Sequence, residues 1–586
     1  MMSQLFRKFI LKLLQLNLIF VLGLNLHVNA QNYPWVNSSY TIPPDLSIQR
    51  YFGVHESNFG DVFVTGNFTG LNCHFGSCTT CLLTNPAAGV PGPWPVFLTK
   101  YNANGNAIWA IQSNTTHSGQ NTGYAVTSDA NGNVYICGSF TSNNFSIGTL
   151  TATSMISGMF VAKFNPTGNI VWLKSPSFNN NSVFSEAFDI KCDPSGNLLV
   201  TGYFGGGTGS LIVLGNHTLT LSQNSCENVF ITKMDNNGNF IWAKSVGGLC
   251  GGNTKGEGGL SLAIDPIGNP IITGYFTSPL VTFGTNTLTK PNNGFNTFIA
   301  KYDSNGNVLW AKSGSGSATY PMGNMARSVS TDQNGNIYIA GYFEDPVFTL
   351  STFSLNNQGQ SDAYIAKLDG LGNIQWAIRE GAGENDAFHS ISTNSLGIFA
   401  LGGFSSSTTI NGNTITTDPN EDPSFIVNYN FNGLGLCTNT LSSNGGSQFR
   451  HTYPSIFASS NGYAFIAGNY GYVNNFIVGT NTLTLGSARN AFVAKYQPCN
   501  LPTLISNENK KHIPKYYPNP VNTEFLIESE EEISKIEINN LVGIKLFEKD
   551  LIKGINKIDL SSLTKGQYII KIYSKFDIVY SRILIE

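Results

Sequence analysis

The stretch "KYDSNGNVLWAKSGSG" begins at Lys301, and near copies of it begin at Lys100, Lys163, Lys233 and Lys367. In each copy, a run rich in β-branched and aromatic residues leads into the pattern Asp/Asn-x-x-Gly-Asn, and a second such run with a Trp follows. A side-chain oxygen of Asp or Asn can cap a tight turn, and Gly accepts the positive φ that such a turn requires. Each copy therefore predicts a β-hairpin with a Trp on its second strand.

A second phrase, such as "NIYIAGYF" (336–343), occurs seven times. Its shared Gly recurs about every 67 residues, a period typical of solenoids and propellers, at positions 66, 138, 202, 274, 341, 402 and 468. Each repeat holds four short runs with strand composition, in the fifth repeat at 327–332, 336–343, 363–369 and 373–379. The pattern predicts an all-β fold, a seven-bladed β-propeller of four-stranded blades spanning residues 31–500.

Two repeats depart from the pattern. The seventh has no Trp run after 491–498, whereas "YPWVNS" (33–38), ahead of the first repeat, carries Trp35. We therefore predict that the N-terminal run pairs with the last repeat and closes the ring, since an open ring would leave strand edges unpaired. In the sixth repeat, Cys437 stands at the Trp position.

The repeated motif has two interpretations besides hairpin architecture. Loops such as "DSNGN" could bind calcium, but each offers at most one carboxylate, fewer than a calcium loop needs. The Trp residues could form a sugar-binding platform, but a residue recurring at one strand position is usually covered by the next blade. We expect turn chemistry and packing between blades, with no metal and no cofactor. These Trp residues are at 109, 172, 242, 310 and 376.

The composition excludes several partners. Only 11% of the residues are charged and the net charge is −3, so nothing favours nucleic acid or an anionic membrane. Residues 1–30 have a basic start, an apolar run and a small-residue end, which predicts a signal peptide cleaved after Ala30. The alternative, a membrane anchor, is disfavoured by polar residues such as Asn17 within a short run. No later segment is apolar and long enough to be transmembrane.

Charged residues become much more frequent after residue 500. We predict a linker at 501–512 and a small β-sandwich domain at 513–586, because short alternating runs such as "QYIIKIYS" and "IVYSRILIE" fill this part.

Both parts resemble known families. The repeats are similar to the seven-bladed, SBBP-type β-propeller repeats of exported bacterial proteins, which implies a fold but no particular activity. The C-terminal part resembles the type A sorting domain of the type IX secretion system in the residues Pro518, Asn519, Pro520, Gly566 and Tyr568. This resemblance implies the type IX machinery as a partner and a secreted protein or one on the outer surface of a Gram-negative bacterium. The alternative is an ordinary adhesive β-domain that stays on the mature protein.

The nine cysteines permit disulfides in an exported chain. In "CHFGSCTTC" (73–81), a disulfide with one spare thiol is favoured over a zinc site. We predict a Cys226–Cys250 disulfide, because in an up-and-down blade the loops that carry them emerge on the same face. A second candidate pair, Cys437 with Cys499, requires contact between adjacent blades.

The sequence contains no metalloprotease His pair, no Gly-x-Ser-x-Gly elbow and no phosphate-binding loop. The polar patch "REGAGENDAFHS" (379–390) could supply an acid/base pair, but we expect solvated loop charges there. The expected function is therefore non-enzymatic: binding or adhesion to a glycan or protein. The alternatives are a surface enzyme that acts on polysaccharide at the channel mouth, and a structural surface-layer component.

The longer, more varied connections all fall on one predicted face, opposite the tight hairpins. Loops on a rigid scaffold are free to carry recognition, so we expect the ligand on that face. The candidate ligand-face residues are Trp94, Lys255, Glu257, Arg327, Glu384, Asp386 and His389.

Overall fold

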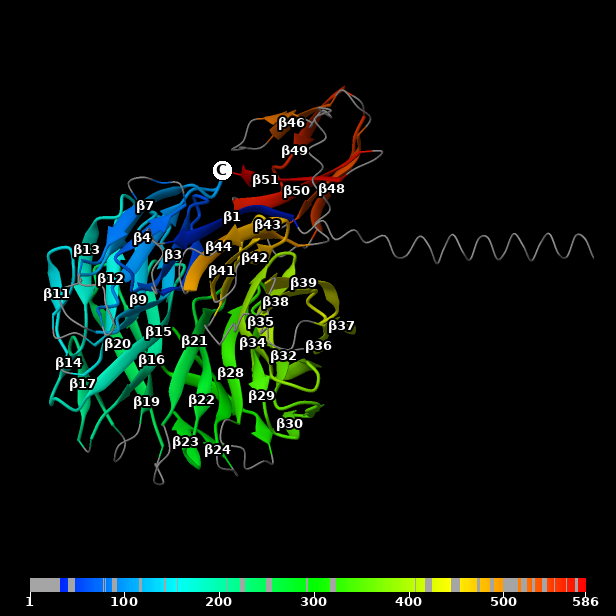
Figure 1. Cartoon of the computed structure of the whole chain (residues 1–586). Helices are drawn as coiled ribbons and strands as arrows, with labels where there is room; N and C mark the ends of the chain where they lie inside the picture. Colours follow the sequence, from blue (N-terminus) through cyan, green and yellow to red (C-terminus); the bar gives the residue numbers. More distant parts are fainter. Residues whose placement is uncertain are drawn as a thin grey trace, which may run out of the picture. The chain divides into compact units, whose positions relative to one another are not determined.

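The computed structural model describes residues 32–40, 48–498 and 515–585, apart from short segments inside the last two ranges, the longest being 444–453. The chain divides into an N-terminal unit, Met1–Asn500, and a C-terminal unit, Leu501–Glu586. Every regular element in the described residues is a β-strand (Figure 1). Accordingly, these residues include no helix that could cross a membrane.

In the described part of the N-terminal unit, seven antiparallel sheets follow one another along the chain, each built on four core strands. Sheet 1 contains β2 (Gln49–Glu56), β3 (Val62–Phe68), β6 (Val96–Tyr101) and β7 (Ala107–Gln112). Sheet 2 contains β8 (Thr122–Ser128), β9 (Val134–Phe140), β12 (Gly158–Phe164) and β13 (Ile170–Lys174). Sheet 3 contains β15 (Phe184–Cys192), β16 (Leu198–Gly205), β19 (Asn228–Met234) and β20 (Phe240–Val246). Sheet 4 contains β21 (Gly258–Ile264), β22 (Pro270–Phe276), β25 (Asn296–Tyr302) and β26 (Val308–Ser313).

The remaining sheets follow the same order. Sheet 5 contains β28 (Asn324–Thr331), β29 (Ile337–Phe343), β32 (Asp362–Leu368) and β33 (Ile374–Glu380). Sheet 6 contains β34 (Asp386–Asn394), β35 (Gly397–Phe404), β38 (Ser424–Tyr429) and β39 (Gly435–Ser443). Sheet 7 contains β40 (Ser455–Ala458), β41 (Ala464–Gly471), β44 (Arg489–Gln497) and, from the N-terminus, β1 (Asn32–Tyr40).

The first strands of consecutive sheets contact one another, from β2 to β8 and onward, and β40 of sheet 7 contacts β2 of sheet 1. Polar side chains tie these strands together. Ser328 Oγ accepts a hydrogen bond from Ile391 N at 3.0 Å, and Ser392 Oγ accepts one from Ala458 N at 2.9 Å. The sheets therefore have a propeller-like arrangement around their first strands.

The Asp/Asn-x-x-Gly-Asn turns use their carboxylates internally. In the quoted stretch, Asp303 Oδ1 accepts hydrogen bonds from the backbone N of Asn305 and Asn307 at 2.9 and 2.8 Å, and Asn307 Nδ2 donates to Asp303 Oδ2 at 2.9 Å. Gly306 has a φ of 80°. The turn itself accounts for the motif, as the sequence predicted.

The repeated Trp residues pack against the next sheet, which confirms their predicted role. Trp310 Nε1 donates to the carbonyl oxygen of Gly370 at 3.2 Å, in the tight turn of sheet 5. Its ring covers Gly372 of the same turn, where a Cβ would lie only 3.0 Å from the ring atoms. Trp109, Trp172 and Trp242 repeat the contact.

The N-terminal strand completes sheet 7, which confirms the prediction that Trp35 lies beside 491–497. β1 pairs antiparallel with β44, with Trp35 opposite Lys495 (Figure 1). Trp35 Nε1 donates to the Ala103 carbonyl oxygen in sheet 1 at 3.0 Å. This is the Trp–turn contact found between the other sheets, so sheet 7 joins sheet 1 in the same way.

Cys437 occupies the Trp position of sheet 6, opposite Asn428. A Trp there would need a tight turn between the third and fourth strands of sheet 7. Sheet 7 has no such turn, because its fourth strand comes from the other end of the chain. Cys437 is instead disulfide-bonded and lies 3.4 Å from the Tyr496 hydroxyl.

Each repeat also contains a two-stranded outer hairpin that the sequence reasoning missed, between its second and third core strands. These hairpins pair β4 (Asn72–Phe75) with β5 (Leu82–Thr84), β10 (Phe145–Ile147) with β11 (Leu150–Ala152), β17 (Leu211–Leu214) with β18 (His217–Thr220), β23 (Leu280–Phe283) with β24 (Asn286–Thr289), β30 (Val347–Leu350) with β31 (Phe353–Asn356), β36 (Ser407–Ile410) with β37 (Asn413–Thr416), and β42 (Asn475–Val478) with β43 (Asn481–Thr484). The signal was present in recurring "NTLT"-like runs at 286–289 and 481–484.

Several outer hairpins join adjacent sheets. β14 (Ser177–Phe178) and β27 (Ser315–Gly316) follow the fourth strands of sheets 2 and 4 and pair with β17 and β30 of the following repeats. In the same way, the fourth strand of sheet 6, β39, pairs with β42 of the next outer hairpin, and the fourth strand of sheet 7, β1, pairs with β4 of the first outer hairpin. Much of the predicted variable loop region therefore serves to link the sheets.

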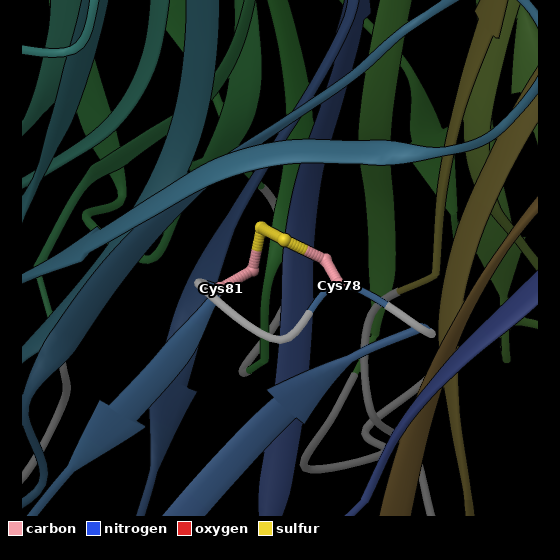
Figure 2. The surroundings of a disulfide bond; sticks show 2 residues. All are labelled: Cys78 and Cys81. Carbon is pink, nitrogen blue, oxygen red and sulfur yellow. A yellow bond between two sulfur atoms is a disulfide. The ribbon is translucent and has the colours of Figure 1, made fainter.

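The "CHFGSCTTC" segment follows the favoured prediction. Cys78 and Cys81 form a disulfide (Figure 2). Cys73 is a buried free thiol. Burial raises the pKa of the Cys73 thiol well above its usual value, so it remains protonated. The described residues contain no group of side chains that could hold a metal ion.

The other cysteine predictions fall on segments outside the described residues. Cys226 and Cys250 both lie there, as does Cys499, the predicted partner of Cys437. The signal segment with Ala30 also lies outside.

The described residues of the C-terminal unit form two antiparallel sheets. One has the order β45 (Lys515–Tyr517), β46 (Glu524–Ser529), β49 (Gly554–Asp559), and the other β48 (Lys545–Asp550), β47 (Ile533–Asn539), β50 (Gly566–Ser574), β51 (Ile578–Ile585). Residues of both sheets, such as Phe525 and Ile570, share one hydrophobic core. Tyr568 is buried and its hydroxyl donates to the Thr564 carbonyl oxygen at 2.6 Å.

Candidate functional site

A cavity of about 1440 Å³ runs along the first strands of the N-terminal unit. All seven sheets contribute to its lining. The residues range from tight-turn residues such as Asn58 and Gln333 to residues beyond the second strands, such as Thr277 and Phe295. A concave cavity of this size is a candidate binding site.

A β-bulge in each of the first six sheets shapes this cavity. In sheet 5, Ala326 pairs with Gly341 and Ser328 with Ala340, so Arg327 is the extra residue. The bulge brings the Met325 carbonyl oxygen against Gly341, where a Cβ would lie 1.9 Å from it. The shared Gly of the second phrase therefore provides the space that the bulge requires.

The bulged residues form a ring around the cavity, and every one of them lines it. They are Phe52, Tyr124, Phe188, Leu260, Arg327 and His389. Each precedes the Ser, Asp or Asn of its first tight turn by five residues in the sequence. The backbone position is constant while the side chain varies, which is the arrangement expected of a recognition ring on a fixed scaffold.

Sheets 1 to 3 supply an aromatic arc, defined as Phe52, Tyr124, Phe188 and Tyr203. Successive ring centroids are 5.6, 4.8 and 5.4 Å apart, so the rings form a continuous surface. The Tyr124 hydroxyl donates to Glu186 Oε2 at 3.1 Å. Burial raises the pKa of the Glu186 carboxyl, and hydrogen bonds from Tyr124 and Tyr203 partly oppose that shift.

Sheets 5 and 6 supply a polar pair, Arg327 and His389. Arg327 Nη1 lies 2.9 Å from His389 Nδ1, and the guanidinium carbon lies 5.0 Å from the Tyr342 ring centroid. Arginine is always a donor, so His389 Nδ1 accepts and the proton of the neutral imidazole is on Nε2. The pair is therefore rich in N–H donors.

Another cation of the lining, Lys191, is paired with a carboxylate. Lys191 Nζ lies 2.7 Å from Asp189 Oδ1, while Asp189 Oδ2 accepts hydrogen bonds from Ser261 Oγ and Leu262 N. Burial and, to a smaller extent, the nearby Lys191 charge lower the pKa of His55 to about 3. These residues stabilise the contacts between the first strands.

The predicted ligand-face residues are not brought together into one site. Arg327 and His389 meet in the cavity, which Trp94 does not line; the Trp94 ring packs under the Arg50 guanidinium at 4.8 Å. Glu384 is exposed and accepts a hydrogen bond from Gln360 Nε2 at 3.2 Å. Lys255 lies outside the described residues.

Two predicted candidates are buried and do not face solvent. Glu257 accepts hydrogen bonds from the backbone N of Gly248 and Ser278, and thereby fixes a connection between sheets. Asp386 accepts a hydrogen bond from Ala382 N at 2.9 Å. In both cases an outer loop folds over the carboxylate, which the sequence pattern alone did not indicate.

Comparison with known proteins gives one curated relative of the repeats. The chain is 26% identical over 421 residues to "Uncharacterized WD repeat-containing protein L264" of Acanthamoeba polyphaga mimivirus. The match covers 62% of this chain and only 29% of that protein's length.

Similar solved structures are distant. A protein of unknown function from Dyadobacter fermentans gives a TM-score of 0.34 at 10% identity, covering 64% of this chain and 93% of its own. Penicillium chrysogenum alpha-L-arabinanase gives a TM-score of 0.29 at 10% identity, covering 64% and 93%. PorZ, a surface component of the type IX secretion system of Porphyromonas gingivalis, gives a TM-score of 0.14 at 9% identity. The match covers 94% of this chain and 100% of the PorZ chain. Similarity at this level says nothing about activity.

The C-terminal unit gives a match to a protein family. Residues 515–586 match the model described as "Secretion system C-terminal sorting domain". The match includes Tyr568, Gly566, which pairs with Ile585, and the Pro518–Pro520 segment, which lies outside the described residues. Residues 515–586 are therefore a C-terminal sorting domain, which marks the chain for type IX secretion to the cell surface or the extracellular space.

Proposed function

We propose that the chain is an exported seven-bladed β-propeller that binds a carbohydrate in its central cavity, without catalysing a reaction. The blades are sheets 1 to 7, with β1 completing the last of them. The observation that carries this proposal is the ring of bulged residues, because it places variable side chains on a rigid frame around a cavity of about 1440 Å³.

The aromatic arc supports a sugar as the ligand. A pyranose ring has an apolar C–H face that packs on an aromatic ring and hydroxyls that need hydrogen-bond partners. Phe52, Tyr124 and Phe188 supply the flat surface and all three line the cavity, and the Tyr124 hydroxyl, which donates to Glu186, gives this surface a polar edge.

We place the entrance at the end of the cavity formed by the connections beyond the second strands. Aromatic residues gather there, since Tyr203, Tyr275, Phe295 and Tyr342 all lie at or after the ends of second strands and line the cavity. The tight-turn end carries Asp residues whose oxygens accept hydrogen bonds from their own turns, such as Asp332.

A glycan array with the full chain and two variants tests the proposal. Tyr124→Ala removes a ring from the aromatic arc, and we expect it to weaken binding roughly tenfold or more, as for a central stacking residue. Phe59→Ala is the matched control, because Phe59 is 64% exposed in a tight turn on the opposite end. Loss of binding with Phe59→Ala alone would contradict the assignment of the face.

One observation favours cleavage of a polysaccharide as a second candidate function. The half-buried Glu186 carboxyl accepts a hydrogen bond from Tyr124 of the aromatic arc, and its pKa is raised by burial, which suits a general acid. The release of new reducing ends from array-positive polysaccharides by the wild type, abolished in Glu186→Gln, would establish an enzyme in place of a binding protein.

A further inference from the structure

The two sides of the bulge ring differ in chemistry. Sheets 1 to 4 place Phe52, Tyr124, Phe188 and Leu260 at the bulge, whereas sheets 5 and 6 place Arg327 and His389 there. The same backbone position thus carries apolar or aromatic groups on one side of the cavity and nitrogen donors on the other. A ligand that spans the ring would meet both.

We propose that the Arg327–His389 pair binds an anionic group, a carboxylate or a sulfate, on the carbohydrate ligand; this inference rests on the proposed function. The guanidinium fork matches two oxygens of such a group in a planar, bidentate contact. Since Arg327 Nη1 donates to His389 Nδ1, the imidazole keeps its proton on Nε2 and adds a further donor.

The pair is held in place before any ligand arrives. The Tyr342 ring lies under the guanidinium at 5.0 Å, and His389 fixes Nη1 at 2.9 Å. Tyr342 itself is only 5% exposed. A long arginine side chain normally loses considerable conformational entropy on binding, so this support reduces the entropic cost of the contact.

Matched pairs of probes, used with the full chain, test the inference by isothermal titration calorimetry. One pair is oligogalacturonate and its methyl ester, and the other is a sulfated galactan oligosaccharide and its desulfated form. We expect one acidic member to bind roughly tenfold more tightly than its neutral partner, a typical contribution of a charge-assisted bidentate contact. The anionic group is a carboxylate if the oligogalacturonate pair shows the preference, and a sulfate if the galactan pair shows it.

Three variants test whether Arg327 causes the preference for the acidic probe. Arg327→Gln is expected to abolish the preference, so that the variant binds the acidic and the neutral probe of each pair with equal affinity. Arg327→Lys is expected to keep part of the preference, because it retains the charge and loses the fork. Lys312→Gln, an exposed site on β26 outside the cavity lining, removes the same charge and is expected to change nothing. Thermal unfolding of each variant shows whether it is folded.

The outcomes separate this inference from the proposed function. Equal binding of acidic and neutral probes by the wild type, or an unchanged preference in folded Arg327→Gln, would overturn the inference and leave carbohydrate binding intact. If Arg327→Gln does not fold, loss of the preference in His389→Phe, which removes the ring nitrogens, supports the inference and its retention overturns it. Binding of no carbohydrate at all would overturn both.

Discussion

Trp35 Nε1 donates a hydrogen bond across 68 positions of the sequence to the carbonyl oxygen of Ala103, at 3.0 Å. The indole also covers Gly105 of the same turn, where a Cβ would lie 2.5 Å from the ring. The bond joins the last sheet to the first, and it has the same form as the Trp–turn contact between interior sheets.

This relationship predicts that Trp35→Ala destabilises the whole N-terminal unit. We expect the free energy of unfolding to fall by about 3 kcal/mol, the usual loss for a large aromatic truncation in a packed site. The unfolding free energy of Trp35→Phe should lie between those of Trp35→Ala and the wild type, because this variant retains a ring and loses the N–H donor. Denaturant unfolding measures the change, and Ile108→Ala, at a 46% exposed site on β7, is the control expected to lie near the wild type.

Gly341→Ala should remove the bulge that presents Arg327. A Cβ at this position would lie 1.9 Å from the Met325 carbonyl oxygen, so the first strand of sheet 5 has to move. We expect a loss of about 3 kcal/mol in unfolding free energy, together with loss of ligand binding. Gly383→Ala is the matched control, because no atom lies within 4 Å of its added Cβ. Equal stability of the two variants would contradict the proposed role of the repeated Gly.

Asp386→Asn should stabilise the protein at neutral pH. Burial and, to a smaller extent, the nearby Asp362 charge raise the pKa of Asp386 to about 6. The native state therefore binds this proton more tightly than the unfolded chain, so the carboxyl lowers the unfolding free energy as the pH rises from about 4 to 6.

Since each pKa unit corresponds to about 1.4 kcal/mol, we expect a gain on the order of 2 kcal/mol at pH 7 for Asp386→Asn. The gain should be near zero at pH 4, where the native carboxyl is protonated. Melting temperatures at the two pH values measure it, with the exposed neighbour Glu384→Gln as a control. A gain that is the same at both pH values would show that ionisation of Asp386 is not its cause.

Asp303→Ala and Asp303→Asn should behave differently. Asp303 Oδ1 accepts two backbone hydrogen bonds in its turn, and Asn can accept the same bonds, as Asn102 and Asn165 do at the corresponding positions. We expect a loss of about 1 kcal/mol for Ala and less than about 0.5 kcal/mol for Asn. Because the turn uses the carboxylate, EDTA should leave the melting temperature unchanged; a lower value with EDTA would indicate a bound cation.

The repeated residues made much of the strand architecture predictable. Asp303, Gly306 and Trp310 each have one physical role that recurs with each repeat, so the sequence specified hairpins, packing between sheets and the incomplete last repeat. Trp35 could be assigned to sheet 7 for the same reason: the missing strand had a recognisable Trp.

The binding cavity was harder to predict, because its ring is defined by backbone position and not by residue type. Phe52, Leu260 and Arg327 share no side-chain property, and only the five-residue spacing to the next turn relates them. The burial of Glu257 and Asp386 depends on how outer loops fold over neighbouring strands. Such tertiary contacts cannot be read from the local sequence around either residue. The outer hairpins were missed because their short runs were treated as variable loops.

The position of β44 has a mechanical consequence. This strand is the last of the N-terminal unit before the chain passes to the sorting domain, and it is paired on one side with β41 and on the other with β1. Tension applied through the C-terminal end would load both ladders in shear, along the strand direction, so that many hydrogen bonds resist together instead of opening one at a time. An N-terminal segment, Asn32–Tyr40, thus reinforces the point at which the exported protein would be pulled.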